Sequence, residues 1–235
     1  MRRILISGTI ANIRRRCVSA GLLAVACLLV KPALADTVTN GDFETGTLSG
    51  WTVFKTSDGS NGTGLPSVVS FDTTGSGASD AAEFNVGEVN FDGKPEGGGL
   101  SQTIAAPGSG LYTLMEDFAS SDDVGDNSDA GTFSILIDGV TVATDSLGFI
   151  SSDQILRGSF NKTVTLTAGS HTFKTEITRV FQAGIGSTST EYVDNISLTP
   201  QFPVSPPSVP EPSSFVLLGS GLLALAGTMR RRFTA

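Results

Sequence analysis

The residues whose types and spacing point most clearly to chemistry lie at the C-terminal end of the chain. They are a tripeptide and three arginines: Pro210, Glu211 and Pro212, then Arg230, Arg231 and Arg232. Between them, residues 213–229 form an uncharged, largely apolar run of 17 residues. As a helix this run would extend about 25 Å, slightly short of a hydrocarbon core of about 30 Å, and the arginines can snorkel to the cytoplasmic interface. The order predicts a membrane-sorting tail with a processing site at the tripeptide; the alternative is a C-terminal anchor that is never cut.

This tail resembles the PEP-CTERM signal of Gram-negative bacteria that make exopolysaccharide. The resemblance covers residues 210–235 and rests on the Pro-Glu-Pro tripeptide, the apolar helix and the arginine cluster. It implies that exosortase, a membrane protease-transferase, recognises the tripeptide and releases the protein to the outside. It also implies a transient insertion of the tail into the membrane.

The first 35 residues have the pattern of a secretory signal peptide. Several arginines precede an apolar stretch of 13 residues, 18–30, which is short for a membrane span. Ala33 and Ala35 place small residues where signal peptidase needs them, so cleavage is expected before Asp36. Lipidation at Cys27 is the weaker alternative, because the residue three positions before it is not Leu.

The predicted mature domain, residues 36–200, is strongly acidic. It holds six basic and 22 acidic residues, a net charge of −16 (6 − 22), whereas the whole chain carries −8. Such a surface repels nucleic acid and anionic lipid and attracts cations. Both cysteines, Cys17 and Cys27, belong to the signal peptide. The mature domain therefore has neither a disulfide nor a thiolate metal site, and its stability must come from its core.

Short β-like runs separated by Gly, Asp, Ser and Asn turns predict an all-β antiparallel sandwich or barrel of nine to eleven strands. The clearest element is a hairpin in which Asp138-Gly139 forms a two-residue type I′ turn between 133–137 and 140–143. In that register Ile137 faces Val140 and Ile135 faces Val142. One buried face is then expected to hold Phe133, Ile135, Ile137, Val140 and Val142.

Alternating apolar residues mark the other strands of the domain. They begin or centre at Trp51, Val69, Phe84, Gln102, Leu114, Val164, Phe173 and 192–198. The proline-rich segment 201–209 is expected to be an extended linker between the domain and the tail.

No pattern for catalysis is present in the domain. His171 is the single histidine and is expected to be structural, and Trp51 is expected to lie in the core. The chain has no nucleophile elbow and no phosphate loop. The acidic stretch 116–129 lacks the EF-hand spacing and is interpreted as a solvated loop. We therefore expect a protein that is not an enzyme.

Two phrases resemble the opening and closing strands of carbohydrate-binding modules with a galactose-binding-like jelly roll. They are Asn40–Gly46, followed by Gly50-Trp51, and Tyr192–Leu198. The resemblance implies a jelly-roll-type sandwich and a structural calcium that joins the first and last strands, with Glu44 and Asp194 in the matching positions. Oxygen ligands and an extracellular setting suit calcium. The alternative is that Asp194, on an apolar face with Tyr192 and Ile196, only accepts backbone hydrogen bonds.

These observations lead to three hypotheses of function. The first is a secreted, non-enzymatic matrix or cell-surface protein that accompanies exopolysaccharide and binds carbohydrate. The second is a structural or adhesive protein without a sugar site, and the third is a polysaccharide hydrolase. Exposed aromatics across a sheet face would favour the first, a uniformly polar acidic surface the second, and two carboxylates about 5–9 Å apart in a cleft the third.

Overall fold

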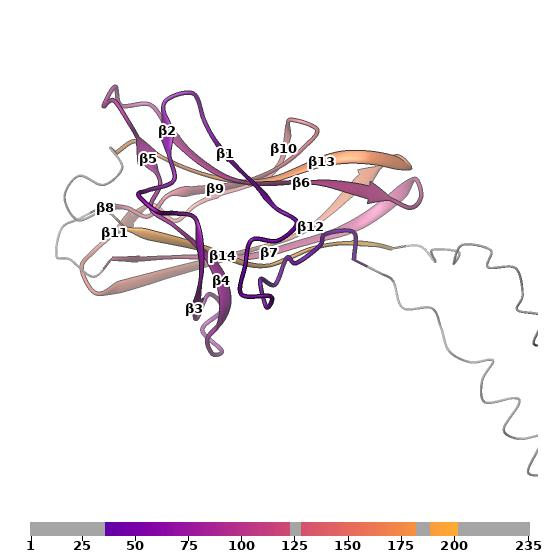
Figure 1. The fold of residues 1–235 in the computed structure, drawn as a ribbon, viewed down its shortest axis with the longest axis horizontal. Helices are drawn as coiled ribbons and strands as arrows, with labels where there is room; N and C mark the ends of the chain where they lie inside the picture. The colour runs from indigo at the N-terminus through magenta and orange to yellow at the C-terminus, as the bar shows by residue number, and fades with distance from the viewer. Residues whose placement is uncertain (1–35, 123–127, 182–188, 202–235) are drawn as a thin grey trace, which may run out of the picture. The chain divides into compact units, whose positions relative to one another are not determined.

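The computed structural model describes residues 36–122, 128–181 and 189–201, which form an all-β domain (Figure 1). The described residues contain 14 strands, all paired antiparallel, and no α-helix. The predicted signal peptide, the sorting tail and all of the linker except Gln201 lie outside these residues. Among the described residues, no helix has the length and hydrophobicity that crossing a bilayer requires.

Ten of the described strands are four residues or longer. They are β1 (Thr52–Lys55), β3 (Ser67–Phe71), β4 (Ser79–Phe84), β6 (Glu96–Ala106), β7 (Gly110–Asp122), β9 (Thr132–Ile137), β10 (Val140–Ser146), β12 (Gln154–Leu166), β13 (Gly169–Arg179) and β14 (Thr190–Pro200). Four more have two residues each: β2 (Gly59–Ser60), β5 (Gly87–Glu88), β8 (Ser128–Asp129) and β11 (Phe149–Ile150).

Two five-stranded sheets form the two layers of the domain. One sheet has the order β1-β6-β13-β9-β10 and is called the β13 sheet; the other has the order β12-β7-β14-β4-β3 and is called the β14 sheet. From β6 onward the chain passes repeatedly from one sheet to the other, and only the β9–β10 hairpin stays within its sheet. This is the jelly-roll-type antiparallel sandwich that the sequence predicted.

The core lies between the two sheets and follows the period of two that the sequence shows. On β7, the side chains of Tyr112, Leu114, Glu116 and Phe118 are all buried. The facing strands add alternating apolar residues: Leu100, Ile104, Phe133, Ile135, Ile137, Phe173 and Ile177. Successive side chains of a strand point to opposite faces, so one face of each sheet closes the core and the other meets solvent.

The predicted β9–β10 hairpin is present, but its register is not the predicted one. Asp138 and Gly139 both have positive φ, +52° and +79°, as a type I′ turn requires. Ile137 pairs with Val140, but a β-bulge at Val142 makes Ala143 the partner of Ile135. The prediction that Val140 shares the buried face is wrong, because its side chain is 65% exposed. Val140 precedes the bulge and pairs with Ile137 as predicted, but it lies at the turn end of an edge strand, where its side chain stays largely uncovered.

The first and last segments of the domain lie side by side. The Ile196 amide donates to the Gly41 carbonyl at 2.8 Å, and the Thr37 amide donates to the Leu198 carbonyl at 3.1 Å. A Cβ atom on Gly41 would overlap the Ile196 carbonyl, so glycine permits this close approach. The opening phrase therefore lies beside the closing strand, but the prediction that it forms the first strand is wrong, because residues 40–46 form turns that precede β1.

The predicted environment of Asp194 is wrong, because a second bulge lies in β14. The register of β14 against β7 shifts between Asp194 and Ser197, and Asn195 has a φ of +52°. As a result Val193 lies in the core, while Asp194 and Tyr192 lie on the outer face of the β14 sheet. Asp194 does not share a face with Ile196 and Leu198, because the extra residue reverses the alternation between them.

Candidate functional site

Asp194 is the centre of a polar cluster on the outer face of the β14 sheet. Its Oδ2 accepts hydrogen bonds from Ser79 Oγ at 2.6 Å and from Thr73 Oγ1 at 3.4 Å, and its Oδ1 accepts one from the Asn195 amide at 2.7 Å. Burial raises the pKa of Asp194, and these hydrogen bonds oppose that rise. Because both oxygens have donors, the buried carboxylate is satisfied by the protein itself.

Glu44, the other predicted calcium ligand, reaches the same strand. Its Oε1 accepts a hydrogen bond from the Asp80 amide at 3.2 Å, next to Ser79, which donates to Asp194. Both predicted ligands thus reach the start of β4, and their oxygens are of the kind that calcium binds. In the part of the chain that the structure describes, no three His, Cys, Asp or Glu side chains come together as a metal cluster. The calcium remains a prediction.

A hollow of about 220 Å³ lies beside this cluster, on the same sheet face. We call it the sheet-face hollow; its lining is Thr73, Thr74, Asp117, Arg157, Gly158 and Ser159. The loop between β3 and β4 forms one wall, and β7 and β12 form the floor. Gly158 contributes only main chain to the floor, because a Cβ atom there would point to the opposite side of the sheet and overlap the buried Phe118 ring.

The two charged side chains of the sheet-face hollow are held in place. Arg157 donates from Nε to the Asp72 carbonyl at 3.0 Å, and its guanidinium lies 3.6 Å from the Asp72 carboxylate. Asp117 accepts from Asn195 Nδ2 at 3.0 Å through Oδ2. The hollow therefore offers a carboxylate and a guanidinium already paired with Asp72, both on the sheet, and hydroxyl groups from the sheet and from the β3–β4 loop.

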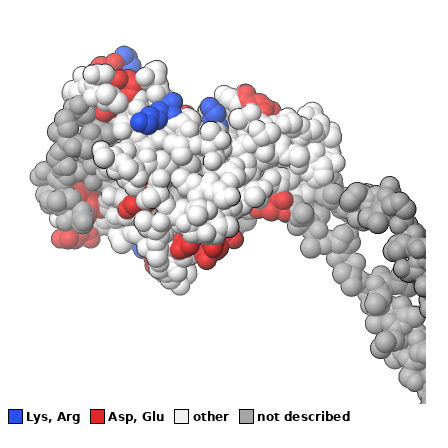
Figure 2. Space-filling view, viewed as in Figure 1, with Lys and Arg blue, Asp and Glu red and all other residues white. Residues whose placement is uncertain are grey.

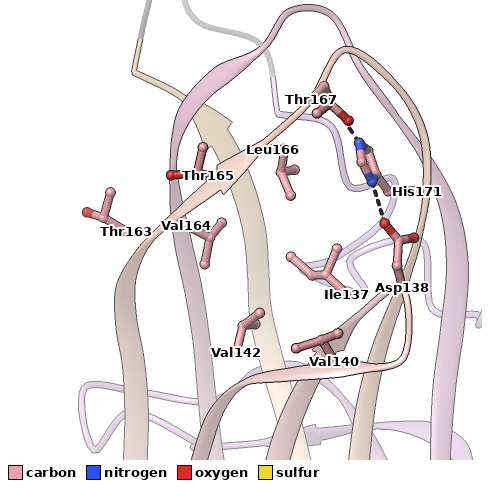
Figure 3. Close-up of a pocket in the computed structure, with 10 residues that line it drawn as sticks. All are labelled: Ile137, Asp138, Val140, Val142, Thr163, Val164, Thr165, Leu166, Thr167 and His171. Carbon is pink, nitrogen blue, oxygen red and sulfur yellow. Dashed lines mark hydrogen bonds and ion pairs between the residues drawn. The ribbon is translucent and has the colours of Figure 1, made fainter.

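A second and larger hollow, of about 520 Å³, opens between the edge strands β10 and β12 (Figure 3). We call it the edge groove; it is lined by Ile137, Asp138, Val140, Val142, Thr163, Val164, Thr165, Leu166, Thr167 and His171. Its walls are mostly aliphatic side chains and threonines. Asp138 and His171 stand together at one end (Figure 3).

His171 forms an ion pair with Asp138 at the end of the edge groove. Its Nδ1 lies 2.7 Å from Asp138 Oδ2, and its Nε2 lies 2.9 Å from the Thr167 carbonyl oxygen. Asp138 Oδ1 also accepts from the Thr172 amide at 2.8 Å. The hydrogen bond to Asp138, together with that to Thr167, raises the pKa of His171. The hydrogen bond from His171 likewise lowers the pKa of Asp138.

Two acids lie inside the sandwich itself. Glu116 accepts from Thr175 Oγ1 at 3.1 Å across the core, and burial raises the pKa of Glu116 to about 8. Glu191 pairs with the buried Arg179 at 3.2 Å. Burial raises the pKa of Glu191 to about 7, although the guanidinium opposes the change. Both acids tie one sheet to the other.

Residues 208–232 match the model of the PEP-CTERM protein-sorting motif. The chain carries a PEP-CTERM sorting motif. The match includes the Pro-Glu-Pro tripeptide and the three arginines, all of which lie outside the described residues. A PEP-CTERM motif indicates a secreted protein that is anchored or processed at the cell envelope.

The domain that precedes the PEP-CTERM motif has no significant match among characterised protein sequences. Among solved structures, the chain is similar to the CBM22-1 xylan-binding domain of Paenibacillus barcinonensis Xyn10C. The two are 11% identical with a TM-score of 0.38, and the match covers 71% of this chain and 95% of that one. A family 35 carbohydrate-binding module from Clostridium thermocellum matches with 18% identity, a TM-score of 0.32, and coverage of 63% and 90%.

Another similar structure is the enzymatically active domain of bacteriophage CBA120 tailspike protein 4, with 17% identity and a TM-score of 0.40 over 69% of this chain. The match spans only 21% of that tailspike chain. At such identities and scores, these likenesses concern the shape of the domain and say nothing of what it binds.

The sequence anticipated some of these positions and missed others. Trp51 lies in the core as predicted, donating from Nε1 to the Asn40 carbonyl at 2.8 Å and packing against Phe43 and Phe173. The sheet-face hollow was missed, because Thr73, Asp117 and Arg157 are far apart in sequence and form no motif. The interpretation of Glu116 as part of a solvated loop is wrong, since its side chain is 1% exposed. The alternation of Tyr112, Leu114, Glu116 and Phe118 was the signal that could have placed it in the core.

Proposed function

We propose that this chain is a secreted, non-enzymatic carbohydrate-binding protein that exosortase sorts to the cell surface or the extracellular matrix, where it accompanies exopolysaccharide. The observation that carries this proposal is the PEP-CTERM motif at residues 208–232. The rest of the chain supports it: a signal-like N-terminus, an acidic domain without cysteine and a rigid β-sandwich. The alternative is a structural or adhesive surface protein without a sugar site.

The sheet-face hollow is the proposed sugar site. Its volume corresponds to about seven water molecules at ~30 Å³ each, which is enough for one sugar residue. An anionic sugar is disfavoured because Asp72 already pairs with Arg157 and the domain carries −16. A cationic ligand would meet Arg157. A neutral sugar can donate hydroxyl protons to Asp117 and accept hydrogen bonds from Arg157 and Ser159.

Aromatic side chains contribute little to this site. Phe71 and Tyr192 lie on the same face as a parallel stack with ring centroids 3.6 Å apart, and Tyr192 is only 7% exposed. The most exposed phenylalanines of the described residues are Phe91, Phe149 and Phe181. They lie outside the two main sheets, so they form no row across a sheet face. Recognition through hydroxyl groups is therefore expected to be weak for a single sugar and to gain from repeated units of a polymer.

Three carboxylates lie at or beside this site, and their arrangement favours binding over hydrolysis. Asp72 is paired with Arg157, and the other two are Asp117 and Asp194. Asp117 and Asp194 are cross-strand partners on β7 and β14. Asp194 is fully buried and both of its oxygens accept hydrogen bonds, so it has no access to a substrate. It does not line the hollow. A glycosidase needs two carboxyl groups that both reach the scissile bond.

A glycan array probed with the full chain, with and without calcium, tests the proposal. We expect binding to neutral polysaccharide, weakened at least tenfold by Asp117→Asn and by Arg157→Ala, since each removes a charged hydrogen-bond partner. Asp145→Asn, on the exposed side of β10, is the matched control and should bind normally. If the unmutated chain binds no glycan on the array, the structural alternative is favoured. If it releases reducing sugar, a hydrolase is favoured.

A further inference from the structure

His171 is the single histidine of the chain, and both of its ring nitrogens face oxygen atoms. The first oxygen belongs to the Asp138 carboxylate and the second to the Thr167 carbonyl. An ionised carboxylate and a carbonyl can only accept hydrogen bonds. Two short contacts of 2.7 and 2.9 Å therefore require a proton on each nitrogen, which makes the ring an imidazolium.

The two acceptors come from different turns at the same end of the sandwich. Asp138 begins the β9–β10 turn, whose strands belong to the β13 sheet. Thr167 directly follows β12, the edge strand of the β14 sheet, where the chain crosses to β13. The ring therefore links the β9–β10 turn to the β12–β13 turn where the edge groove ends (Figure 3).

A neutral ring could keep only one of these contacts. The proton would stay on Nδ1, because the charged Asp138 carboxylate is the stronger acceptor. The lone pair of Nε2 would then face the Thr167 carbonyl oxygen at 2.9 Å. Two facing lone pairs repel, so the turn that carries Thr167 would move away from the ring.

From this geometry we infer that His171 is a pH-dependent clamp: charged, it holds the β12–β13 turn against the β9–β10 turn, and neutral, it releases that turn and opens the end of the edge groove. The clamp is independent of the proposed sugar site, which lies on the outer face of the β14 sheet.

The surroundings of the ring favour its charged form. The residue opposite His171 on β6 is Ile104, and the groove residues from β9 and from the end of β12, Ile137 and 163–167, are uncharged. Among the described residues that line the groove, Asp138 is the only other titratable group. The hydrogen bonds to Asp138 and Thr167 raise the pKa of His171 above its ordinary 6.5, while burial opposes the rise.

The direction of the pH effect follows from this raised pKa. The clamp is fully present below the ordinary value of 6.5, where the ring is charged in the folded and the unfolded chain alike. It is lost as the pH rises through the higher folded value. Protonation of Asp138 would remove the carboxylate partner, and because the hydrogen bond from His171 lowers the pKa of Asp138, this takes a pH below the ordinary range of an Asp carboxyl.

The first test is nitrogen NMR of the full chain, solubilised in detergent and labelled at histidine, which gives one set of ring signals. We expect both ring nitrogens to carry protons at about pH 6, and the titration midpoint to lie above 6.5. In Asp138→Asn the midpoint should fall below that of the unmutated chain, because the negative partner is gone. Asp145→Asn, on the exposed side of β10, should not move it.

The second test is hydrogen exchange of the amides around the β12–β13 turn, expressed as protection factors. Raising the pH from about 6 to about 9 should lower their protection about ten- to hundredfold, the effect of losing one charge-assisted hydrogen bond. His171→Gln should abolish this pH dependence. A ring with one proton at about pH 6, a midpoint at or below 6.5, or a pH dependence that persists in His171→Gln would each overturn the inference.

Discussion

Glu116 lies at the centre of the core without an opposite charge. Its cross-strand neighbour on β12 is Phe160, and Thr175, which donates to it, stands between Leu100 and Ile135. Oε2 of Glu116 has no hydrogen-bond partner among the described residues. A carboxylate in such surroundings is costly, so Glu116 is held as the neutral acid.

Replacing Glu116 by Gln should make the stability of the domain less dependent on pH. The pKa of Glu116 rises from 4.5 unfolded to about 8 folded, so the folded state binds the extra proton and its advantage is lost as the pH rises between these values. The loss amounts to a few kcal/mol at most, on the order of 1.4 kcal/mol per pH unit. Urea unfolding at about pH 5 and about pH 8 should show a smaller difference for Glu116→Gln. An unchanged difference would mean that Glu116 is ionised in the folded state.

Asp194 gives a second prediction, which concerns calcium. If Glu44 and Asp194 hold a calcium ion between the first and last strands, a hundredfold excess over the dissociation constant adds about 2.7 kcal/mol of stability. A chelator should then lower the melting temperature by several degrees, and Asp194→Asn should abolish this response. Ser79→Ala should be measured beside it. This substitution removes the hydroxyl that donates to Asp194 Oδ2 at 2.6 Å and that satisfies the carboxylate without an ion. A melting curve that a chelator leaves unchanged would make Asp194 a hydrogen-bond acceptor only.

Sequence reading at the level of single residues succeeded where alternation alone decided the environment. Leu114 follows the period of two and is buried as expected; Trp51 is also buried, but Val53, which was expected to alternate with it, is 43% exposed. It failed for Asp194, because one extra residue at Asn195 moves the side chain to the opposite face. Nothing local in the sequence marks that bulge, since Asn tolerates a positive φ but does not require it.

At the scale of elements, turn chemistry was more predictable than strand register. Asp138-Gly139 specified the type I′ turn because both positions need a positive φ. The bulge that follows at Val142 depends on how β10 packs at the edge of its sheet, beside β12. The alternation of apolar and polar residues along a strand does not predict tertiary packing of this kind.

Gly139→Ala tests how much this turn contributes. Gly139 has a φ of +79°, and a Cβ atom there would meet no other heavy atom within 4 Å, so the penalty is conformational and not steric. We expect a loss of about 1 kcal/mol in the free energy of unfolding. Val140→Thr, at a largely exposed position of the same hairpin, should change it by less than about 0.5 kcal/mol. Equal effects of the two substitutions would contradict the role of the turn.

At the scale of the whole molecule, the fold class was predictable and the strand pairing was not. Many short alternating runs with frequent turns favour two packed sheets. The partners of each strand follow from contacts between distant segments, such as β6 with β13 and β7 with β14, and the sequence carries no local record of them. The candidate site could not be predicted for the same reason, because the sheet-face hollow combines residues from three separate parts of the chain.

The charge of the domain is also a property of the whole molecule. Figure 2 shows acidic side chains in several separate groups, with few basic ones and a large uncharged area on that face. A net charge of −16 over residues 36–200 keeps such proteins apart in solution and disfavours an anionic partner. This supports a neutral polysaccharide as the partner in the proposed function.

The final prediction concerns the path of the whole chain to the cell surface. The PEP-CTERM match covers residues 208–232, where Glu211 is the only acidic residue. If a protease recognises the tripeptide, Glu211→Ala should leave a precursor retained by the cell, because the apolar run and its three arginines would remain in the membrane. Immunoblots of cells and medium measure this directly. Glu176→Ala, within the folded domain, is the matched control and should be processed normally. A Glu211→Ala protein that is still released at the mature size would show that processing does not depend on the tripeptide, and the tail would then be cut through another signal.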